Sequence, residues 1–436
     1  MTDRAVRVGL CGLGTVGQGV LALLDEGAAS IAARAGAHLT ITHIGTRTPK
    51  PDIDTAGARD SRDVFAVARD PEIDIVIELI GGTTVAKELV IEALRHEKHV
   101  VTANKALLAD HGEELFSLAE HQGVSLRFEA AVAGGIPIIE TVKTSLVANE
   151  ITAVAGIING TGNFILTAMA SEGRAFDDVL SEAQKRGYAE ADPTFDVDGT
   201  DASQKLVLLA SLAFGAAISS DAPYKQGVDS VAPEDLEFAK ELGYRIKHLG
   251  IAKREGGALQ LRVHPTLIPE GKAIAQVDGV LNAVMINATG VGELLLVGPG
   301  AGSRPTASAV CGDLVSIAAA LARNESPTAP SMGVPVSALN PVAIADINDV
   351  SSGWYLRLDA EDKPGVMAAI TGHLGKQGIG IESLIQKPDT REGTYVPVII
   401  LTDTARTKSL HAAISVIEAM PSVAGSVTCL RVENFN

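Results

Sequence analysis

Residue types that define several other protein classes are scarce in this chain of 436 residues. The three cysteines, Cys11, Cys311 and Cys429, lie far apart and show no CxxC spacing, which excludes a disulfide framework or a zinc site as the organising element. Aromatic residues make up only 3 % of the chain, so its hydrophobic content of 46 % is mainly Val, Ile, Leu and Ala. That composition is typical of helices packed on a parallel sheet.

Positive charge and long apolar runs are also scarce. The net charge is −17 and no basic cluster occurs, so neither nucleic acid nor a membrane surface is an expected partner. The longest apolar run, Leu206–Ile218, is shorter than the roughly 18 residues that a membrane-spanning helix needs. Met1–Arg4 leads directly into a predicted strand. We therefore expect no signal peptide and a cytoplasmic protein.

A strand, a glycine-rich turn and a helix follow one another at the start of the chain. Ala5–Cys11 is apolar and β-branched, the turn reads GLGTVG, and helical spacing follows it. This order is the context that a dinucleotide fingerprint requires, because the glycines let the backbone approach a pyrophosphate at a helix N-terminus. The sequence therefore predicts a Rossmann-type α/β domain that binds its cofactor through Gly12, Gly14, Thr15, Val16 and Gly17.

The second predicted strand, His38–Gly45, ends without an acidic residue. A site specific for NAD usually places Asp or Glu there to bind the ribose hydroxyls. Here Thr46 and Arg47 follow the strand, and an arginine can pair with a 2′-phosphate. We expect a preference for NADP with NAD use left open. The alternative is that Arg47 is a surface residue in a turn.

Two charged residues follow later strands of the same predicted sheet. Lys105 comes after the strand that starts at His99, and Glu129 ends the strand Val124–Ala130. Ligands of open α/β sheets bind beyond the carboxyl ends of the strands, so Lys105 is expected at the cofactor crevice unless it is only a surface charge. Glu129 precedes AVAGGIPI, a loop whose carbonyl oxygens can surround a hard cation. A tight turn with a hydrogen-bonded glutamate is the simpler alternative.

An acidic stretch, Gly187–Lys205, lies in the middle of the chain. It holds five carboxylates, ends in a lysine, and is followed by a predicted buried helix that begins at Leu206. Asp201 and Lys205 are four residues apart, so a helix places both on one face. A cation held beside carboxylates on a rigid element suits general acid–base catalysis. The alternative is an exposed ion pair that contributes little.

The pattern becomes mixed after Ile138. A predicted helix and a predicted strand come first, followed by a polar turn at Asn159–Asn163. This turn suits a small polar substrate, and the alternative is an ordinary helix N-cap. Strands at Ala258–Ile268 and Ala283–Val297 indicate a second domain, and Gly298–Gly302 opens a long helix. The C-terminal part reads βαββαβ, the ferredoxin-like order. We predict a dinucleotide-binding domain at 1–135, a catalytic and dimerisation domain at 136–320, a linker at 321–350, and a regulatory domain at 351–436 with a strand at Thr394–Thr402.

Six motifs in this order resemble the homoserine dehydrogenase family over nearly the whole chain: GLGTVG, TANK, EAAVAGGIPI, INGTGNFIL, GYAEADPTFDVDGTDASQK and GPGAG. The C-terminal unit resembles an ACT domain, with DKPGV at its turn. The resemblance implies an oxidoreductase that interconverts L-homoserine and L-aspartate 4-semialdehyde with NAD(P), in the biosynthesis of threonine, methionine and isoleucine. It also implies a homodimer or homotetramer.

The resemblance also implies roles for single residues. Lys205 is expected to donate or accept the substrate proton, Asp201 and Glu190 to hold homoserine, and Lys105 to serve cofactor, substrate and catalysis. The implied set for a monovalent cation, Na⁺ or K⁺, is Glu129, Val132, Gly134 and Ile136. The implied further cofactor contacts are Gly187, Glu190 and Gly302. L-threonine is the expected effector at the ACT domain, and truncation near Ser352 is expected to leave a folded, active enzyme.

Two other functions compete with this interpretation. Aspartate-semialdehyde dehydrogenase shares a Rossmann start but needs a cysteine nucleophile in mid-chain, and none occurs between Cys11 and Cys311. A non-catalytic amino-acid sensor with an ACT domain is the second, and the presence of Lys105, Asp201 and Lys205 argues against it.

Overall fold

The computed structural model describes residues 5–325, 329–387 and 395–435. Three predicted features lie wholly or partly outside the described residues: the N-terminal segment Met1–Arg4, part of the linker, and the start of the strand at Thr394. The chain forms two compact units, each assembled from three separate stretches. The first comprises Met1–Gly160, Ser203–Ala222 and Leu281–Val342, and the second comprises Thr161–Ala202, Pro223–Val280 and Ala343–Asn436.

A six-stranded parallel sheet with strand order β3-β2-β1-β4-β5-β6 forms the centre of the first unit. This is the doubly wound arrangement of dinucleotide-binding domains, and it confirms the predicted fold class. Its strands are β1 (Ala5–Cys11), β2 (His38–Gly45), β3 (Arg59–Ser61), β4 (Ile75–Glu78), β5 (His99–Thr102) and β6 (Leu126–Arg127). Its helices are α1 (Thr15–Glu26), α2 (Ala28–Ala35), α3 (Val64–Arg69), α4 (Val85–Arg95) and α5 (Lys105–Gln122).

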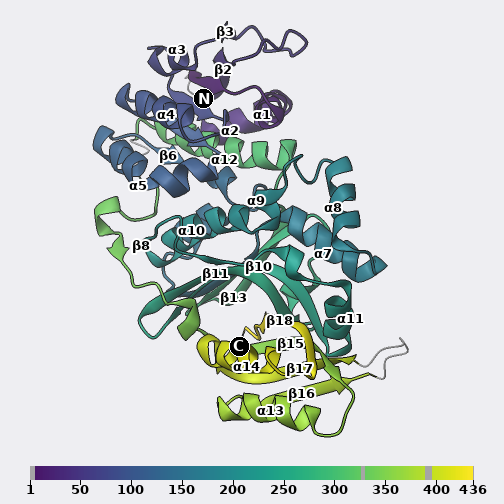
Figure 1. Ribbon diagram of the computed structural model, residues 1–436. Helices are drawn as coiled ribbons and strands as arrows, with labels where there is room; N and C mark the ends of the chain where they lie inside the picture. The colour runs from purple at the N-terminus through teal and green to yellow at the C-terminus, as the bar shows by residue number, and fades with distance from the viewer. Residues whose placement is uncertain (1–4, 326–328, 388–394, 436) are drawn as a thin grey trace. The chain divides into compact units, whose positions relative to one another are not determined.

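Helix α12 (Ser303–Ala322) completes this domain from a distant part of the sequence. In Figure 1 it lies beside α1 and α2, and its apolar residues Val310, Leu314 and Ile317 belong to the same core as β1. Among the described residues, α12 is long and apolar enough to cross a membrane, and half of its apolar window is buried. A core helix passes the same test by length and composition, and the packing of α12 is that of a core helix.

Two predictions for this region need correction. The predicted strand Val124–Ala130 is reduced to β6 because Glu129–Ala131 forms a 3₁₀ turn, η1. The helix predicted after Ile138 is short: α6 (Ile138–Glu140) passes into the π-helical segment η2 (Thr141–Ser145).

Three antiparallel strands also belong to the first unit. Strand β12 (Leu281–Ala288) pairs with β7 (Ile151–Ile157) on one side and with β13 (Gly292–Pro299) on the other. The segment predicted as strand from Ala283 to Val297 is therefore a hairpin. The remaining elements of this unit include most of α10 (Thr200–Phe214), β8 (Ala216–Ala217), η5 (Val336–Ala338) and β14 (Asn340–Pro341).

The second unit contains a sheet with strand order β10-β11-β18-β15-β17-β16. The last four strands alternate with two helices as βαββαβ, which confirms the ferredoxin-like order predicted for the C-terminal part. The strands are β9 (Tyr224–Lys225), β10 (Tyr244–Glu255), β11 (Ala258–Pro269), β15 (Ser351–Glu361), β16 (Ile381–Gln386), β17 (Tyr395–Arg406) and β18 (Val423–Val432). The helices are α7 (Gly160–Glu172), α8 (Phe176–Lys185), α9 (Thr194–Val197), α11 (Pro233–Glu241), α13 (Val366–Lys376) and α14 (Thr407–Glu418), with short 3₁₀ turns η3 (Val228–Ser230), η4 (Ala273–Gln276) and η6 (Ile347–Asp349).

The two faces of the C-terminal strands pack on different cores. Trp354, Leu356 and Leu358 of β15 pack with α13 and α14, whereas Tyr355 packs with residues of α7 and α11. The alternation follows from the period of two along a strand. Strand β18 also continues the sheet by pairing in parallel with β11.

The expectation that truncation near Ser352 leaves a folded enzyme stays a prediction, and this shared packing weighs against it. Truncation near Ser352 would remove Tyr355, Ile399, Leu401, Leu430 and Val432 from a shared core. It would also remove the strand that pairs with Thr266 and Leu267 of β11. Asp235 at the start of α11 is fully buried and accepts hydrogen bonds from Tyr355 Oη at 3.0 Å and Arg357 Nε at 2.5 Å. These contacts join α11 to β15.

We predict that Asp235→Asn lowers the free energy of unfolding by roughly 3 kcal/mol, since breaking a buried ion pair leaves an uncompensated charge. The Arg357 side chain is 23 % exposed, which places the effect at the lower end of the range for such pairs. Urea titration of both proteins measures it. The matched control is Asp349→Asn, which breaks the exposed Lys408–Asp349 pair and should cost below about 1 kcal/mol. Equal small losses in both variants would contradict the prediction.

Candidate active site

The glycine turn between β1 and α1 has three positions with three different constraints. Gly12 has φ +106°, and a Cβ there would lie 2.4 Å from the Leu79 carbonyl oxygen. A Cβ on Gly17 would lie 2.2 Å from the Gly12 carbonyl oxygen. Gly14 differs because a Cβ there would meet nothing within 4 Å. The first and third glycines therefore permit the tight turn and the close packing of helix on strand, and the second leaves open space for a pyrophosphate.

The start of α12 lies against the same turn. Ser303 Oγ donates a hydrogen bond to the Thr15 carbonyl oxygen at 2.7 Å. A Cβ on Gly19 would lie 2.7 Å from the Ser303 carbonyl oxygen, so α1 and α12 approach closely here. Gly302, which caps α12 with φ +123°, is thereby brought beside the predicted cofactor loop. Sequence spacing could not reveal the Ser303 contact because the two segments are 288 residues apart.

Lys105 is the first residue of α5, at the carboxyl edge of the parallel sheet. The preceding Asn104 caps the helix by accepting from the Leu107 N–H and ties the loop to Gly82 through a 2.7 Å bond. Beneath it, Thr102 Oγ donates to the fully buried carboxylate of Glu78 at 2.6 Å. No role was predicted for Glu78 from the sequence. Its position as a charged residue at the end of the apolar strand in IDIVIELI could have indicated one.

Two arginines flank the end of β2. Arg47 is exposed just after the strand, as predicted. Arg62 Nη1 donates to the Thr46 carbonyl oxygen at 3.0 Å, so a second cation lies next to Arg47. Sequence reasoning missed Arg62 because β3, which carries the chain to that point, is short and polar and was not predicted.

Three of the four predicted cation ligands, Glu129, Gly134 and Ile136, line one cavity of about 360 Å³. The fourth, Val132, is fully buried beside them in the chain. Both carboxylate oxygens of Glu129 accept backbone N–H bonds at the start of α6, one from Ile139 at 2.9 Å and one from Glu140 at 2.8 Å. This is the hydrogen-bonded turn that was the simpler alternative. Because a carboxylate offers about four lone-pair positions, the two bonds leave room for a cation.

The cavity holds carboxyl groups of Glu129 and Asp313 together with the cation Arg127, whose Nη1 lies 3.8 Å from Asp313 Oδ1. Burial raises the pKa of Glu129 to about 7 and the pKa of Asp313 to about 6. Asp313, on α12, accepts a hydrogen bond from the Glu129 N–H at 2.9 Å, which places two carboxyl groups in one buried region. Among the described residues no group of three or more His, Cys, Asp or Glu side chains is arranged to hold a metal. A cation here would depend on carbonyl oxygens.

Lys205 lies on α10 and its ammonium group is anchored. The Nζ atom donates to the Ile158 carbonyl oxygen at 2.8 Å, just beyond the end of β7. Helix α10 begins at Thr200, six residues before the predicted start, so Asp201 occupies its first turn. Asp201 is only 8 % exposed, which rules out the exposed ion pair considered from the sequence. Lys105 and Lys205 belong to the first compact unit, and Asp201 and Glu190 belong to the second.

The remaining acids of the stretch have different positions. Asp192 Oδ1 accepts from Thr194 N–H and Oγ, and Asp198 Oδ1 accepts from the Thr200 N–H at 2.7 Å. Each carboxylate thus accepts from the residue two positions on and orders the turn before a helix, which is a structural role. Glu190 is exposed and follows the turn at Gly187, which has φ +73°.

Of the polar segment Asn159–Asn163, the last four residues form the first turn of α7, and Asn159 immediately precedes the helix. Thr161 Oγ donates to the Tyr188 carbonyl oxygen at 2.7 Å, two residues before Glu190. Asn163 is buried and donates to the Val277 carbonyl oxygen at 3.1 Å. The turn thus fixes the start of the acidic stretch.

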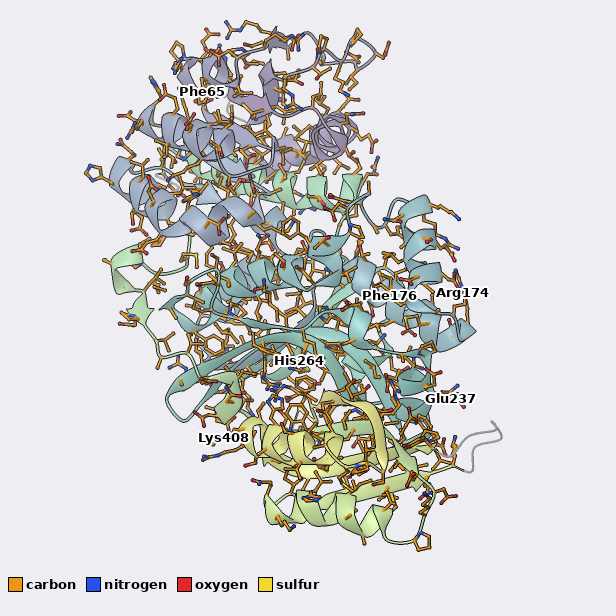
Figure 2. All side chains as sticks on the ribbon, viewed as in Figure 1. Phe65, Arg174, Phe176, Glu237, His264 and Lys408 are labelled. Carbon is orange, nitrogen blue, oxygen red and sulfur yellow. The ribbon has the colours of Figure 1, made fainter. Side chains whose placement is uncertain are left out.

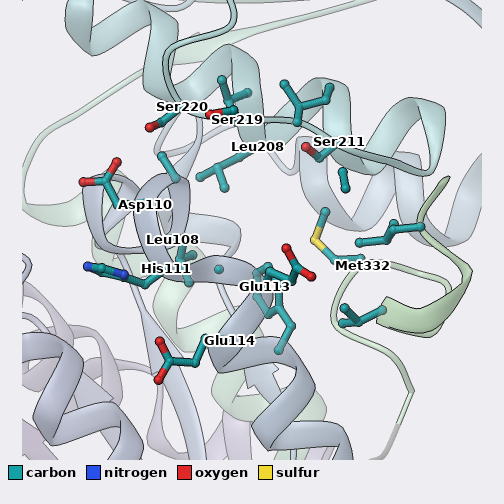
Figure 3. A pocket seen from close by; sticks show the side chains of 18 of the residues that line it. Leu108, Asp110, His111, Glu113, Glu114, Leu208, Ser211, Ser219, Ser220 and Met332 are labelled. Atoms are coloured by element: carbon teal, nitrogen blue, oxygen red, sulfur yellow. The ribbon is translucent and has the colours of Figure 1, made fainter. Parts of the chain in front are cut away.

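A larger cavity of about 710 Å³ contains none of the predicted site residues. In Figure 3 the carboxylates of Asp110, Glu113 and Glu114 project from α5, with Ser219 and Ser220 on the other side. Cavity size alone would therefore misplace the site.

The three thiols are free, and Cys11 and Cys311 are buried. Burial raises the pKa of Cys11 well above its ordinary value and that of Cys311 to about 12. Neither forms a thiolate near neutral pH, which removes the basis for a cysteine nucleophile.

The doubly wound sheet and its glycine turn define a dinucleotide-binding oxidoreductase, and the βαββαβ unit adds an ACT-type module. Three family models match successive parts of the chain. The model described as "Homoserine dehydrogenase, NAD binding domain" matches residues 12–129, "Homoserine dehydrogenase" matches 137–315, and "ACT domain" matches 354–419. The chain belongs to the homoserine dehydrogenase family, whose members act on the CH–OH group of their donors.

Known relatives resemble the chain over its length. A homoserine dehydrogenase from Pseudomonas aeruginosa is 48 % identical over 99 % of this chain and 100 % of its own. The crystal structure of a homoserine dehydrogenase from Thiobacillus denitrificans has a TM-score of 0.93 at 46 % identity, covering 100 % of this chain and 99 % of that one. A hyperthermophilic archaeal homoserine dehydrogenase in complex with NADPH has a TM-score of 0.61 at 26 % identity, covering 72 % of this chain and 97 % of that one.

We predict that Gly14→Ala weakens cofactor binding alone, whereas Gly17→Ala also destabilises the fold. Gly14→Ala has space for its methyl group in the free protein, so its thermal midpoint should be unchanged while NADPH affinity falls at least about tenfold, or 1.4 kcal/mol. Gly17→Ala serves as the comparison, because its methyl group meets backbone and should lower the midpoint as well. NADPH fluorescence titration and thermal unfolding without cofactor measure the two effects. Unchanged NADPH affinity in Gly14→Ala would contradict the placement of the pyrophosphate.

Proposed function

We propose that the protein catalyses the NAD(P)-dependent interconversion of L-homoserine and L-aspartate 4-semialdehyde, in the cytoplasmic biosynthesis of threonine, methionine and isoleucine. Support comes chiefly from the intact glycine turn in a chain that belongs to this family from residue 12 onward. The test is NADPH formation from L-homoserine, followed spectrophotometrically. A non-catalytic sensor would show no turnover and would refute the proposal.

The domain boundaries predicted from the sequence are part of the proposal as a functional division. We assign cofactor binding to 1–135, substrate chemistry and dimerisation to 136–320, connection to 321–350, and regulation to 351–436. The compact units interleave these segments, so the division describes roles along the chain rather than independently folding pieces.

The reaction requires both a hydride and a proton to leave the substrate carbinol. The nicotinamide cofactor supplies the hydride acceptor. Lys205 takes the hydroxyl proton in oxidation, and in reduction its ammonium group stabilises the developing alkoxide and returns the proton. The 2.8 Å bond from Nζ to the Ile158 carbonyl oxygen orients the amine and uses one of its three N–H groups in the charged form.

Carboxylates suit the ammonium group of an amino-acid substrate, and we assign this role to Asp201 and Glu190. Asp201 shares a helix face with Lys205, one turn earlier. Lys105, at the carboxyl edge of the sheet, is assigned to cofactor and substrate. We assign the pyrophosphate to the glycine turn, with Gly12, Gly14, Thr15, Val16 and Gly17 as its contacts. Further cofactor contacts are assigned to Gly187, Glu190 and Gly302.

A monovalent cation, Na⁺ or K⁺, is proposed at Glu129, Val132, Gly134 and Ile136. The raised pKa of Glu129, caused by burial, is the kind of unfavourable ionisation that a nearby cation relieves. Rates in sodium, potassium and choline salts at one ionic strength test this site. Identical rates in all three would argue against a catalytic effect of the cation.

L-threonine is proposed as an effector at the turn Asp362–Val366 of the ACT domain, in a homodimer or homotetramer. The support is the presence of the ACT domain, because threonine is a product of the proposed pathway. Coupling of about 1–3 kcal/mol between the two sites is typical of such regulation. Initial rates that do not change with threonine over the millimolar range would exclude it.

We predict that Lys205→Ala lowers kcat by about 10²–10⁴-fold, the range for a general acid–base group, with NADPH affinity nearly intact. Lys185→Ala removes an exposed lysine at the end of α8 and is the matched control for loss of one positive charge. Steady-state kinetics with homoserine and NADPH titration measure both. Retention of most of kcat would remove Lys205 from the mechanism.

We also propose a preference for NADP and predict that Arg47→Ala raises KM for NADP while KM for NAD is nearly unchanged. The reason is that a guanidinium pairs with the 2′-phosphate, which NAD lacks. Arg62→Ala tests the neighbouring cation in the same way. An equal change in KM for both cofactors would show that Arg47 does not read the 2′-phosphate.

A further inference from the structure

A cavity of about 480 Å³ lies within the second unit, away from every residue assigned above. Helix α14, strand β18 and the short strand β9 contribute to its wall. Its mouth carries exposed polar residues, among them Ser230, His411 and Ser426. Its floor carries the buried residues Trp354 and Arg431.

Within the part of the chain that the structure describes, the hydrogen-bond and ring contacts of Arg431 are with uncharged groups. Its residue is 3 % exposed, and its two terminal nitrogens donate to Ser352 Oγ at 3.2 Å and Thr407 Oγ at 3.0 Å. The guanidinium carbon lies 4.2 Å from the centre of the Trp354 ring, its cross-strand partner in the sheet. This is a cation–π contact of the kind that aromatic rings provide to desolvated cations.

No carboxylate of the described residues forms an ion pair with Arg431. The nearest candidate in the chain, Glu433, pairs instead with the buried Arg262 at 2.5 Å. Buried charges in proteins are normally paired, because removing a cation from water is costly. Burial, assisted by the charge of Arg262, lowers the pKa of Arg431 to about 10, so the group stays charged near neutral pH.

We propose that this cavity binds a small carboxylate, whose anionic group pairs with the guanidinium of Arg431. A planar guanidinium matches a carboxylate in two parallel hydrogen bonds. Ile414 and Val427 form an apolar wall for the rest of the ligand, and none of the described residues that line the cavity is Asp or Glu. The volume suits a molecule of amino-acid size. The site is distinct from the effector position proposed at Asp362–Val366.

The chain carries its own reporter, because its one tryptophan, Trp354, lies in this cavity. Titration of the full-length protein with acetate, L-threonine and inorganic phosphate, at constant ionic strength in chloride, is followed by tryptophan emission. Carboxylates are expected to give a saturable change. Arg431→Met should weaken the apparent affinity at least tenfold.

Lys408→Met is the matched control, since Lys408 is an exposed cation on α14 that does not line the cavity and is labelled in Figure 2. It should titrate like the unaltered protein. Ser426→Phe obstructs the mouth from an exposed position, and it should also abolish the response if Arg431→Met does not fold.

Three results would overturn the proposal: no saturable change with any carboxylate, a response that survives both Arg431→Met and Ser426→Phe, or saturation by phosphate alone. The readout is independent of turnover. Failure of the proposed dehydrogenase activity would therefore leave this test unaffected, and failure here would leave the dehydrogenase assignment standing.

Discussion

The buried carboxylate of Glu78 organises the edge of the sheet where the cofactor is expected to bind. Its two oxygens accept from the N–H groups of Ile80 and Gly81 and from the hydroxyl of Thr102. Thr102 in turn accepts from the Asn104 N–H at 3.0 Å, immediately before Lys105. One carboxylate thus fixes the loops after β4 and β5. None of the described residues forms an ion pair with Glu78, and these three donors keep its buried carboxylate hydrogen-bonded.

Backbone clearance is the second constraint, and it acts on the same edge. Gly12 and Gly17 are required by contacts of 2.4 and 2.2 Å that any Cβ would make with backbone atoms. The return of α12 to the turn through Ser303 and Gly302 depends on another close approach, at Gly19. The glycine pattern therefore serves the packing of two distant helices as well as the approach of a pyrophosphate.

Charge pairing distinguishes the two ends of the second unit. Asp235 joins α11 to β15 through Arg357 and Tyr355, and its charge is fully compensated. Arg431, on the other face of the same sheet, contacts hydroxyls and an indole ring, and no carboxylate of the described residues pairs with it. The first arrangement stabilises the fold, because both charges are satisfied within it. In the second arrangement the buried guanidinium of Arg431 can still pair with the anionic group of a ligand.

The sequence by itself determined the features that depend on neighbours in the chain. β1, β2, the turn from Gly12 to Gly17 and the βαββαβ order follow from period-two alternation, helical spacing and turn residues, which are local. The i, i+4 relation of Asp201 and Lys205 is of the same kind. Tertiary structure decided what depends on distant segments: the Glu129–Asp313 contact, Arg62 beside Arg47, and the sheet that joins β18 to β11. Such pairings depend on how distant segments pack together, and no local pattern of residues encodes them.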